Sequence, residues 1–205
     1  MIRADNAHRI LRAHAERLAS TATDPGLPNP TASTLGLADD IGRVLDALAE
    51  QFAPHPGSLP RTAVPAEVPH ETGEGDLDEE RLLLATATAY PAEVRQMRWL
   101  TEADFLLPLP AALLQSITAL IHRGDMADPV TVLGEAQHRG LLTDSLTPRN
   151  LMALVSTPAG SPEYWGEKIL KRALLARAHT VAARITAYTD DLAPPAHHRQ
   201  PPRPR

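Results

Sequence analysis

The sequence predicts an all-α protein: a small helical head domain followed by a long helix of hairpin type, with an N-terminal helical pair in front. Hydrophobic residues make up 43% of the 205 residues but aromatic residues only 3%, so a core must be built from Leu, Ala, Val and Ile. Leu and Ala favour helices, and no long run of β-branched residues opposes them. The 20 prolines occur in clusters, which is typical of connectors around compact helical parts.

Residues 1–53 are predicted to form an N-terminal helical extension. Apolar residues recur at helical spacing over residues 3–22 and again over residues 37–52, and "TDPGLPNPTAS" separates the two stretches. The apolar positions are Ile10, Leu11, Ala15 and Leu18 in the first helix and Ile41, Val44, Leu45, Leu48 and Phe52 in the second. Because neither narrow stripe can be buried alone, we expect the helices to pair with each other or with a partner.

Two segments rich in proline flank the predicted head domain. Residues 54–76 carry prolines and glycines without a helical period, which predicts an extended linker. Residues 192–205, "LAPPAHHRQPPRPR", are predicted to be a disordered proline- and arginine-rich tail. The acidic residues at the end of the linker are interpreted as solvated charges near a helix N-terminus; they are Glu67, Glu71, Glu74, Asp76, Asp78, Glu79 and Glu80.

The head domain, residues 77–191, shows repeated helix start and stop signals. Asp76 is the predicted N-cap of its first helix, and Thr101 with Asp104 resembles a capping box. Pro110 lies in the first turn of a helix that ends at Gly124. In "DMADPVTVLGEAQHRGLL", Asp128 and Pro129 start a helix that ends at Gly140, with Val130, Val132, Leu133 and Ala136 on its buried side. The pairs Thr147–Pro148 and Ser161–Pro162 repeat this start signal.

The last predicted helix, about 162–191, carries a long apolar seam at near-heptad spacing. Its members are Leu170, Leu174, Ala178, Val181, Ile185 and Tyr188. The seam is longer than the short head helices can cover, so we expect another helix against it, from this chain or from a second copy. Trp165, at the start of this helix, is interpreted as an anchor to the head, with an interface hot spot as the alternative.

The sequence contains no recognised catalytic motif. It lacks a phosphate-binding glycine-rich loop before either of its lysines, Lys168 and Lys171, and it has no cysteine. The histidines have no metal-ligand spacing. We therefore predict no catalytic residue, no metal site and no cofactor. With no secretory signal and no long apolar run, we expect a cytoplasmic protein that does not enter a membrane.

Three blocks in a fixed order give residues of about 78–190 a family resemblance. They are "DEERLLLATATAYP", then "WLTEADFLLPLPAALLQSITALIHRGDMADPVTVLGEAQHRGLL", then "LMALVSTPAGSPEYWGEKILKRALLARAHTVAARITAYTDD". In this order they resemble the N-terminal domain of DnaB-type replicative DNA helicases. Pro108 and Pro110 depart from the family pattern. After Tyr188 the sequence shows neither the second hairpin helix nor the RecA-like motor of that family.

The resemblance implies a non-catalytic interaction module. Domains of this family pair through helical hairpins, form the collar of the helicase ring and bind primase and loading factors, and they have no catalytic residues to carry over. We therefore expect a role in DNA replication through binding of a helicase, a primase or a second copy (a dimer) by the long helix. The implied interface residues are Trp165, Leu170, Leu174, Ala178, Val181, Ile185 and Tyr188.

Two other functions stay open at this point. The first is a nucleic-acid-binding accessory with weak DNA contact, although a net charge of −5 gives no general attraction to phosphates. Its candidate residues are Lys168, Lys171, Arg172, Arg177 and Arg184 of the long helix and Arg199, Arg203 and Arg205 of the tail. Because few aromatic residues lie among them, the basic residues of the long helix are interpreted as a solvated face rather than a stacking groove. The second is a domain that folds and dimerises without any other partner.

Overall fold

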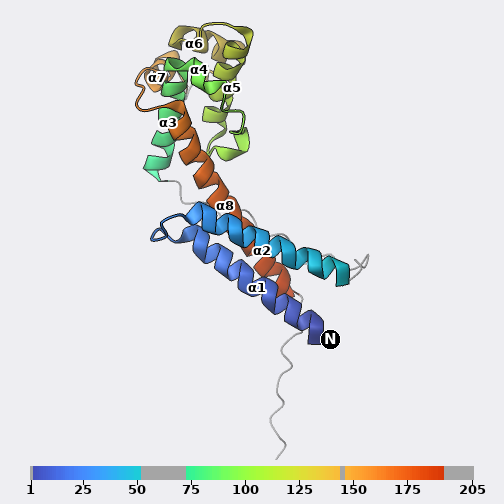
Figure 1. The fold of residues 1–205 in the computed structure, drawn as a ribbon. Coiled ribbons are helices and arrows are strands. Elements are labelled where there is room, and N and C mark those ends of the chain that lie inside the picture. Colours follow the sequence, from blue (N-terminus) through green and yellow to red (C-terminus); the bar gives the residue numbers. More distant parts are fainter. Residues whose placement is uncertain (1, 52–72, 144–145, 192–205) are drawn as a thin grey trace, which may run out of the picture. The chain divides into compact units, whose positions relative to one another are not determined.

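The computed structural model describes residues 2–51, 73–143 and 146–191, and all regular elements in these ranges are helices (Figure 1). The predicted all-α fold is confirmed. The predicted tail, and the predicted linker up to residue 72, lie outside the described residues. The elements are α1 (Ile2–Thr23), α2 (Pro30–Gln51), α3 (Glu74–Ala89), α4 (Pro91–Val94), the 3-10 helix η1 (Glu102–Asp104), α5 (Pro108–Arg123), α6 (Pro129–His138), α7 (Pro148–Val155) and α8 (Pro162–Asp191).

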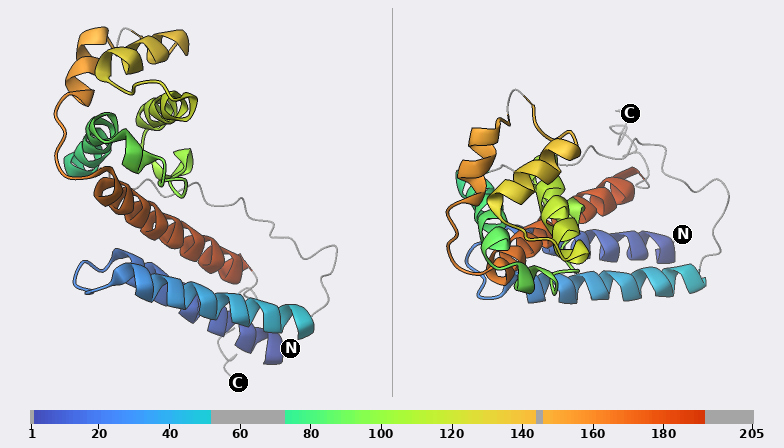
Figure 2. Two further views of the ribbon diagram at one scale, coloured as in Figure 1. Left: turned by 45° about the horizontal axis from the view of Figure 1, so that its top comes forward. Right: turned by 90° about the horizontal axis from the view of Figure 1, so that it is seen from above.

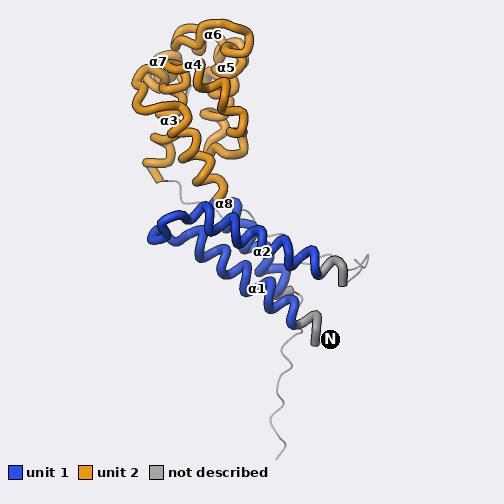
Figure 3. Tube along the Cα trace, in the orientation of Figure 1, with its two compact units in different colours: residues 1–68, 175–205 blue, residues 69–174 orange. Residues whose placement is uncertain are grey.

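The chain forms two compact units (Figure 3). Unit 2 contains α3 to α7, η1 and α8 up to Leu174, whereas unit 1 contains α1, α2 and α8 from Leu175 onward. The boundaries expected from the sequence placed the whole long helix with the head, at 77–191. The structure instead divides α8 between the two units, because its two halves are buried by different helices.

Unit 2 has a continuous apolar core built from the faces that the helical periodicity predicts. Fully buried side chains come from α3, α5, α6, α7 and the first half of α8; they include Leu83, Leu84, Leu113, Ile117, Val132, Leu151 and Ile169. Ile169 belongs to α8, so the first half of the long helix is part of this core.

Unit 1 is built on an antiparallel pair, α1 and α2, which lie side by side in both views of Figure 2. Its core consists of Ala15 and Leu18 from α1, Ile41 from α2 and Ala182 from α8. The predicted pairing of the two N-terminal helices is therefore confirmed. No helix in the described ranges is long and apolar enough to cross a membrane.

Most helix ends in unit 2 follow the predicted signals. Asp128 Oδ1 accepts hydrogen bonds from the backbone N–H groups of Val130 (2.8 Å) and Thr131 (3.0 Å). Thr147 and Ser161 cap α7 and α8 in the same way through their hydroxyl oxygens. Gly124 and Gly140 take the positive φ values, 82° and 69°, that end helices favourably only at glycine.

Three local predictions were wrong. The N-cap of α3 is Gly73, and Asp76 lies in the first turn, where its Oδ2 accepts from the Gly73 N–H at 3.1 Å. Helix α2 begins at Pro30 because Asn29 Oδ1 caps its first turn by accepting from the Ala32 N–H. Val130, predicted to be buried, is 68% exposed because α6 turns only Val132 and Ala136 fully into the core.

We expect replacement of Asp128 by Ala to lower the melting temperature, with Asp128→Ser keeping most of the cap. Hydrogen bonds from Thr131, first from its backbone N–H, lower the pKa of Asp128 below its ordinary value of 3.8. A carboxylate with a lowered pKa in the folded state stabilises the protein above its unfolded pKa and loses that effect as the pH falls through the folded value. Thermal melts of both variants between pH 7 and pH 2 check this; equal melting temperatures for the Ala and Ser variants would contradict it.

Candidate interaction surface on the long helix

The start of α8 is anchored to unit 2 by Trp165. The indole Nε1–H donates a hydrogen bond of 2.5 Å to the carbonyl oxygen of Ala159, and the ring packs against the core of unit 2. Gly160 has a φ of 81°, and a Cβ at this position would lie 3.2 Å from Trp165 Nε1. These contacts agree with the anchoring role expected for Trp165. Its alternative role in an interface stays a prediction.

At the next residue, α8 comes very close to the segment after α4. Gly166 is buried, and a Cβ there would meet Met97 Cε and lie 2.9 Å from Trp99 Cη2. Sequence reasoning did not single out this glycine, because a glycine inside a helix carries no local signal for what packs against it. Gly166 therefore sets how closely α8 packs against residues 97–99.

We expect Gly166→Ala to destabilise unit 2 by up to about 2 kcal/mol, because overpacking costs about 1–3 kcal/mol and the gain in helix propensity offsets only about 1 kcal/mol of it. Gly134 is the matched control: it also lies inside a helix, α6, but has no atom within 4 Å of an added Cβ. Gly134→Ala should therefore stabilise the protein. Urea unfolding followed by circular dichroism measures both variants, and an equal gain for the two would show that α8 has room at Gly166.

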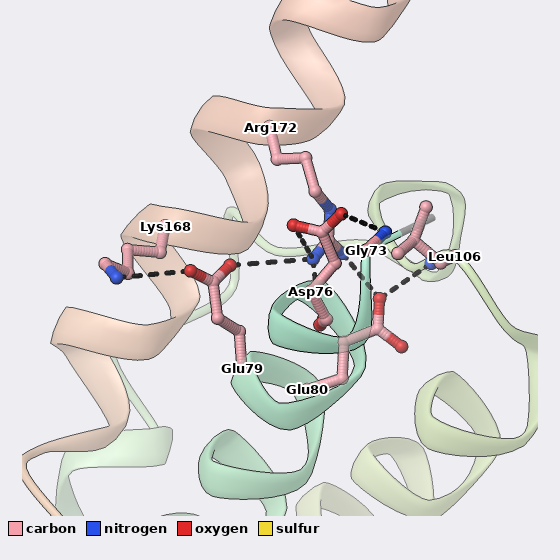
Figure 4. Close-up of polar contacts among 7 residues, drawn as sticks. All are labelled: Gly73, Asp76, Glu79, Glu80, Leu106, Lys168 and Arg172. Carbon is pink, nitrogen blue, oxygen red and sulfur yellow. Dashed lines mark hydrogen bonds and ion pairs between the residues drawn. The ribbon is translucent and has the colours of Figure 1, made fainter. Parts of the chain in front are cut away.

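The strongest polar contact of α8 is a buried ion pair with α3 (Figure 4). Glu80 is 0% exposed, and its Oε1 accepts from Arg172 Nη2 at 2.5 Å and from the Leu106 N–H at 2.7 Å. The Arg172 side chain is 9% exposed, and its Nη1 also donates to the Asp76 carbonyl oxygen at 3.1 Å. One guanidinium thus joins α8 to the first turns of α3, and Glu80 joins α3 to the loop before α5.

Burial raises the pKa of Glu80, while the hydrogen bonds from Leu106 and Arg172 oppose that rise. Glu80 Oε2 is buried without a hydrogen-bond partner among the described residues. A buried carboxylate with an incomplete set of partners depends strongly on its one counter-charge. The ion pair is therefore a sensitive point in the attachment of α8 to α3.

A second, exposed pair lies beside the first (Figure 4). Lys168 Nζ donates to Glu79 Oε1 at 3.1 Å, and the hydrogen bond with Glu79 raises the pKa of Lys168. The ammonium also lies over the rings of Tyr164 and Trp165, at 5.5 and 5.3 Å from their centroids. Exposed pairs of this kind contribute little to stability.

These pairs correct two interpretations made from the sequence. Glu79 and Glu80 were assigned to a solvated acidic cluster, and Lys168 and Arg172 to a solvated basic face. The structure instead brings the two sets together. The sequence did contain a signal for this pairing. Asp76, Glu79 and Glu80 share one face of α3 by their spacing. Lys168 and Arg172 are four positions apart and share one face of α8.

In the second half of α8, the residues of the predicted seam lie at the edge of the helix face that is buried in unit 1. Ala178 and Ile185 pack against the core of unit 1, whose α8 member is Ala182 at 0% exposure. Val181 is 44% exposed, and Tyr188 is half-buried. In unit 2, Leu170 and Leu174 are also half-buried. The helix against this part of the seam comes from the chain itself, which was one of the two sources expected.

Sequence reasoning missed Ala182, the centre of the buried face. Ala178, Ala182, Ile185 and Thr189 recur at helical spacing, and Ala182 and Thr189 are both buried. The heptad pattern favoured the larger side chains of Val181 and Tyr188, one position away from this face. Small residues allow helices to approach closely, so the small side chains were the informative ones.

The described residues contain no group of three or more His, Asp or Glu side chains that could hold a metal ion. Their closest charged clusters are the two ion pairs of Figure 4 and the Arg123–Glu135–Arg139 contacts between α5 and α6. Both clusters join helices to one another.

The comparisons with known proteins agree with this architecture. Residues 74–169 match the family model described as "DnaB-like helicase N terminal domain", a non-catalytic domain. The match runs from the first residue of α3 into α8 and so covers most of unit 2. No curated protein and no solved structure matches the chain. Residues 74–169 of the chain are therefore similar to the DnaB-like helicase N-terminal domain.

Proposed function

We propose that this protein is a non-catalytic interaction module of DNA replication, which binds a replicative helicase, a primase or a second copy of itself through the second half of α8. The family match supports the connection with helicases. The observation that carries the proposal is the edge of α8 in unit 1, where Val181 lies exposed next to the fully buried Ala182.

This edge has the features of a partner-binding surface. Val181 and Tyr188 are seven positions apart and are exposed or half-buried, so they continue the apolar face beyond Ala182 and Ile185, which pack in the core of unit 1. A partner helix laid along this edge would bury apolar area without rearranging the core of unit 1. The helical region of a helicase or a second α8 would fit this role.

The nucleic-acid alternative has less support. Two of the five basic α8 residues predicted to contact phosphates, Lys168 and Arg172, are paired with carboxylates of α3. Binding of phosphates at these positions would require those pairs to break. The basic residues of the tail lie outside the described residues.

Replacement of Val181 by Asp tests the proposal, because the side chain is exposed and the fold should be kept. We expect association to weaken by at least about tenfold, since an unpaired charge in an apolar interface costs several kcal/mol. Sedimentation of the protein alone, and pull-down with the host helicase and primase, measure the effect.

Ala13 of α1, also exposed, provides the matched control. The Ala13→Asp variant introduces the same charge into unit 1 away from α8 and should associate like the unaltered protein. The proposal fails if Val181→Asp and Ala13→Asp behave alike. It also fails if the unaltered protein binds neither helicase, primase nor itself at micromolar concentration.

A further inference from the structure

Unit 2 has a second surface, separate from α8, in the form of a groove along α5. The groove has a volume of about 410 Å³. Its α5 lining residues share one helix face over about three turns, or about 17 Å: Ala111, Leu114, Gln115, Thr118, Ala119 and His122. The opposite wall comes from α4, the segment after it and η1, through Val94, Arg95, Met97, Arg98, Leu100, Thr101, Glu102 and Phe105. We call this surface the α5 groove.

The floor of the α5 groove is apolar, and the side of the groove formed by α5 carries small side chains. Val94, Met97, Ala111 and Leu114 are buried and form the floor. Thr118 and Ala119 are small, half-buried side chains on the α5 side, so they leave the groove open along its length. An apolar groove of this length and openness fits the apolar face of a helix.

The charges along the α5 groove are mainly basic. Arg95, Arg98 and His122 are exposed on its edges. Neither Arg98 nor His122 has a hydrogen-bond or ion-pair partner among the residues that the structure describes, whereas Arg95 donates to the Ile121 carbonyl oxygen. The one carboxylate, Glu102, already accepts from Gln115 Nε2 at 2.9 Å. Two arginines against one carboxylate give the groove an excess of positive charge, which favours an acidic occupant.

We propose that the α5 groove binds an amphipathic helix of a partner protein, with apolar residues on one face and carboxylates beside them. The apolar face would lie on Leu114 and Ala119, and the carboxylates would pair with Arg98. This surface lies outside the α8 edge of the proposed function.

The test uses a synthetic helical peptide of about 12 residues, the length that spans the groove, composed of Leu, Ala and Glu. A second peptide replaces every Glu by Lys. We expect the full-length protein to bind the Glu peptide, as measured by fluorescence anisotropy, with amide NMR shifts at α4, η1 and α5. We expect at least about tenfold weaker binding of the Lys peptide and of the Glu peptide to Arg98→Glu.

Two protein variants act as controls. Arg149 of α7 is exposed, like Arg98, but lies away from the groove, and Arg149→Glu should bind the Glu peptide normally. Val181→Asp should also bind it normally, which separates this site from the α8 surface. Equal affinity for both peptides, an equal loss in both arginine variants, or NMR shifts confined to α8 would overturn the proposal.

Three other occupants would give distinct results, each of which overturns the assignment to a partner helix. Displacement of the peptide by a short DNA duplex would assign the groove to nucleic acid. Groove shifts that appear when the protein alone is concentrated would assign it to a second copy. A gain in peptide affinity on replacing Glu67 and Glu71 by Gln would assign it to the chain's own acidic segment.

Discussion

Replacement of Arg172 by Ala is expected to destabilise unit 2 by about 3–5 kcal/mol, the cost of leaving a buried carboxylate without its counter-charge. Glu80 Oε1 keeps only the Leu106 N–H in this variant, and Oε2 has no partner to offset the loss. The attachment of α8 to α3 also loses the bond from Arg172 to the Asp76 carbonyl. Urea unfolding and hydrogen exchange of α3 amides measure the effect.

Lys168 is the matched control for Arg172, since it pairs with the same helix from one turn away but is exposed. Lys168→Ala should cost much less than Arg172→Ala. The deficit of Arg172→Ala should also grow with pH. A folded-state pKa raised above the unfolded value gives a stabilisation that is present below the unfolded pKa and lost as the pH rises through the folded pKa. A similar cost for both variants, or a deficit independent of pH from 4 to 8, would contradict a buried charge at Glu80.

Replacement of Ala182 by Asp is expected to unfold unit 1 while the core of unit 2 persists. Ala182 is fully buried against Ala15, Leu18 and Ile41, and an unpaired carboxylate there costs several kcal/mol. The core of unit 1 is small, so it cannot offset that cost. Amide NMR spectra should lose the dispersed signals of α1 and α2 and keep those of α5 to α7.

Val181→Asp provides the control for Ala182→Asp, because it places the same charge on the adjacent, exposed residue of α8. It should leave α1 and α2 folded. If Ala182→Asp left the signals of unit 1 unchanged, α8 would not form part of that unit. If Val181→Asp also unfolded unit 1, the edge proposed to bind partners would instead belong to the core.

The α5 groove and the α8 edge suit partner helices that differ in charge. The α8 edge is apolar around Val181 and suits a helix with little charge, whereas the α5 groove adds Arg98 and His122 to an apolar floor. The variants Val181→Asp and Arg98→Glu remove the two contacts separately.

The helices themselves were largely predictable from the sequence. Proline at the first helical position, a capping side chain before it and a glycine after the last turn located α6 and the start of α7 to the residue. These signals depend on contacts within one helical turn, so they can be recognised from residues that are close together in the sequence. The wrong prediction of the α3 start also concerned residues within one helical turn. Asp76 and Gly73 both suit a helix start, and only the backbone geometry shows that Gly73 is the cap.

The sequence by itself determined an all-α chain, most of the helix ends in unit 2, a resemblance to a known family over part of the chain and the absence of a recognised catalytic motif. Only the tertiary structure decided which charges are buried and which face of α8 is covered. Glu80 and Arg172 are 92 positions apart, and Ala182 meets Leu18 from the other end of the chain. Composition and periodicity describe a residue's neighbours along the helix. The burial of a charge depends on what another helix places against it.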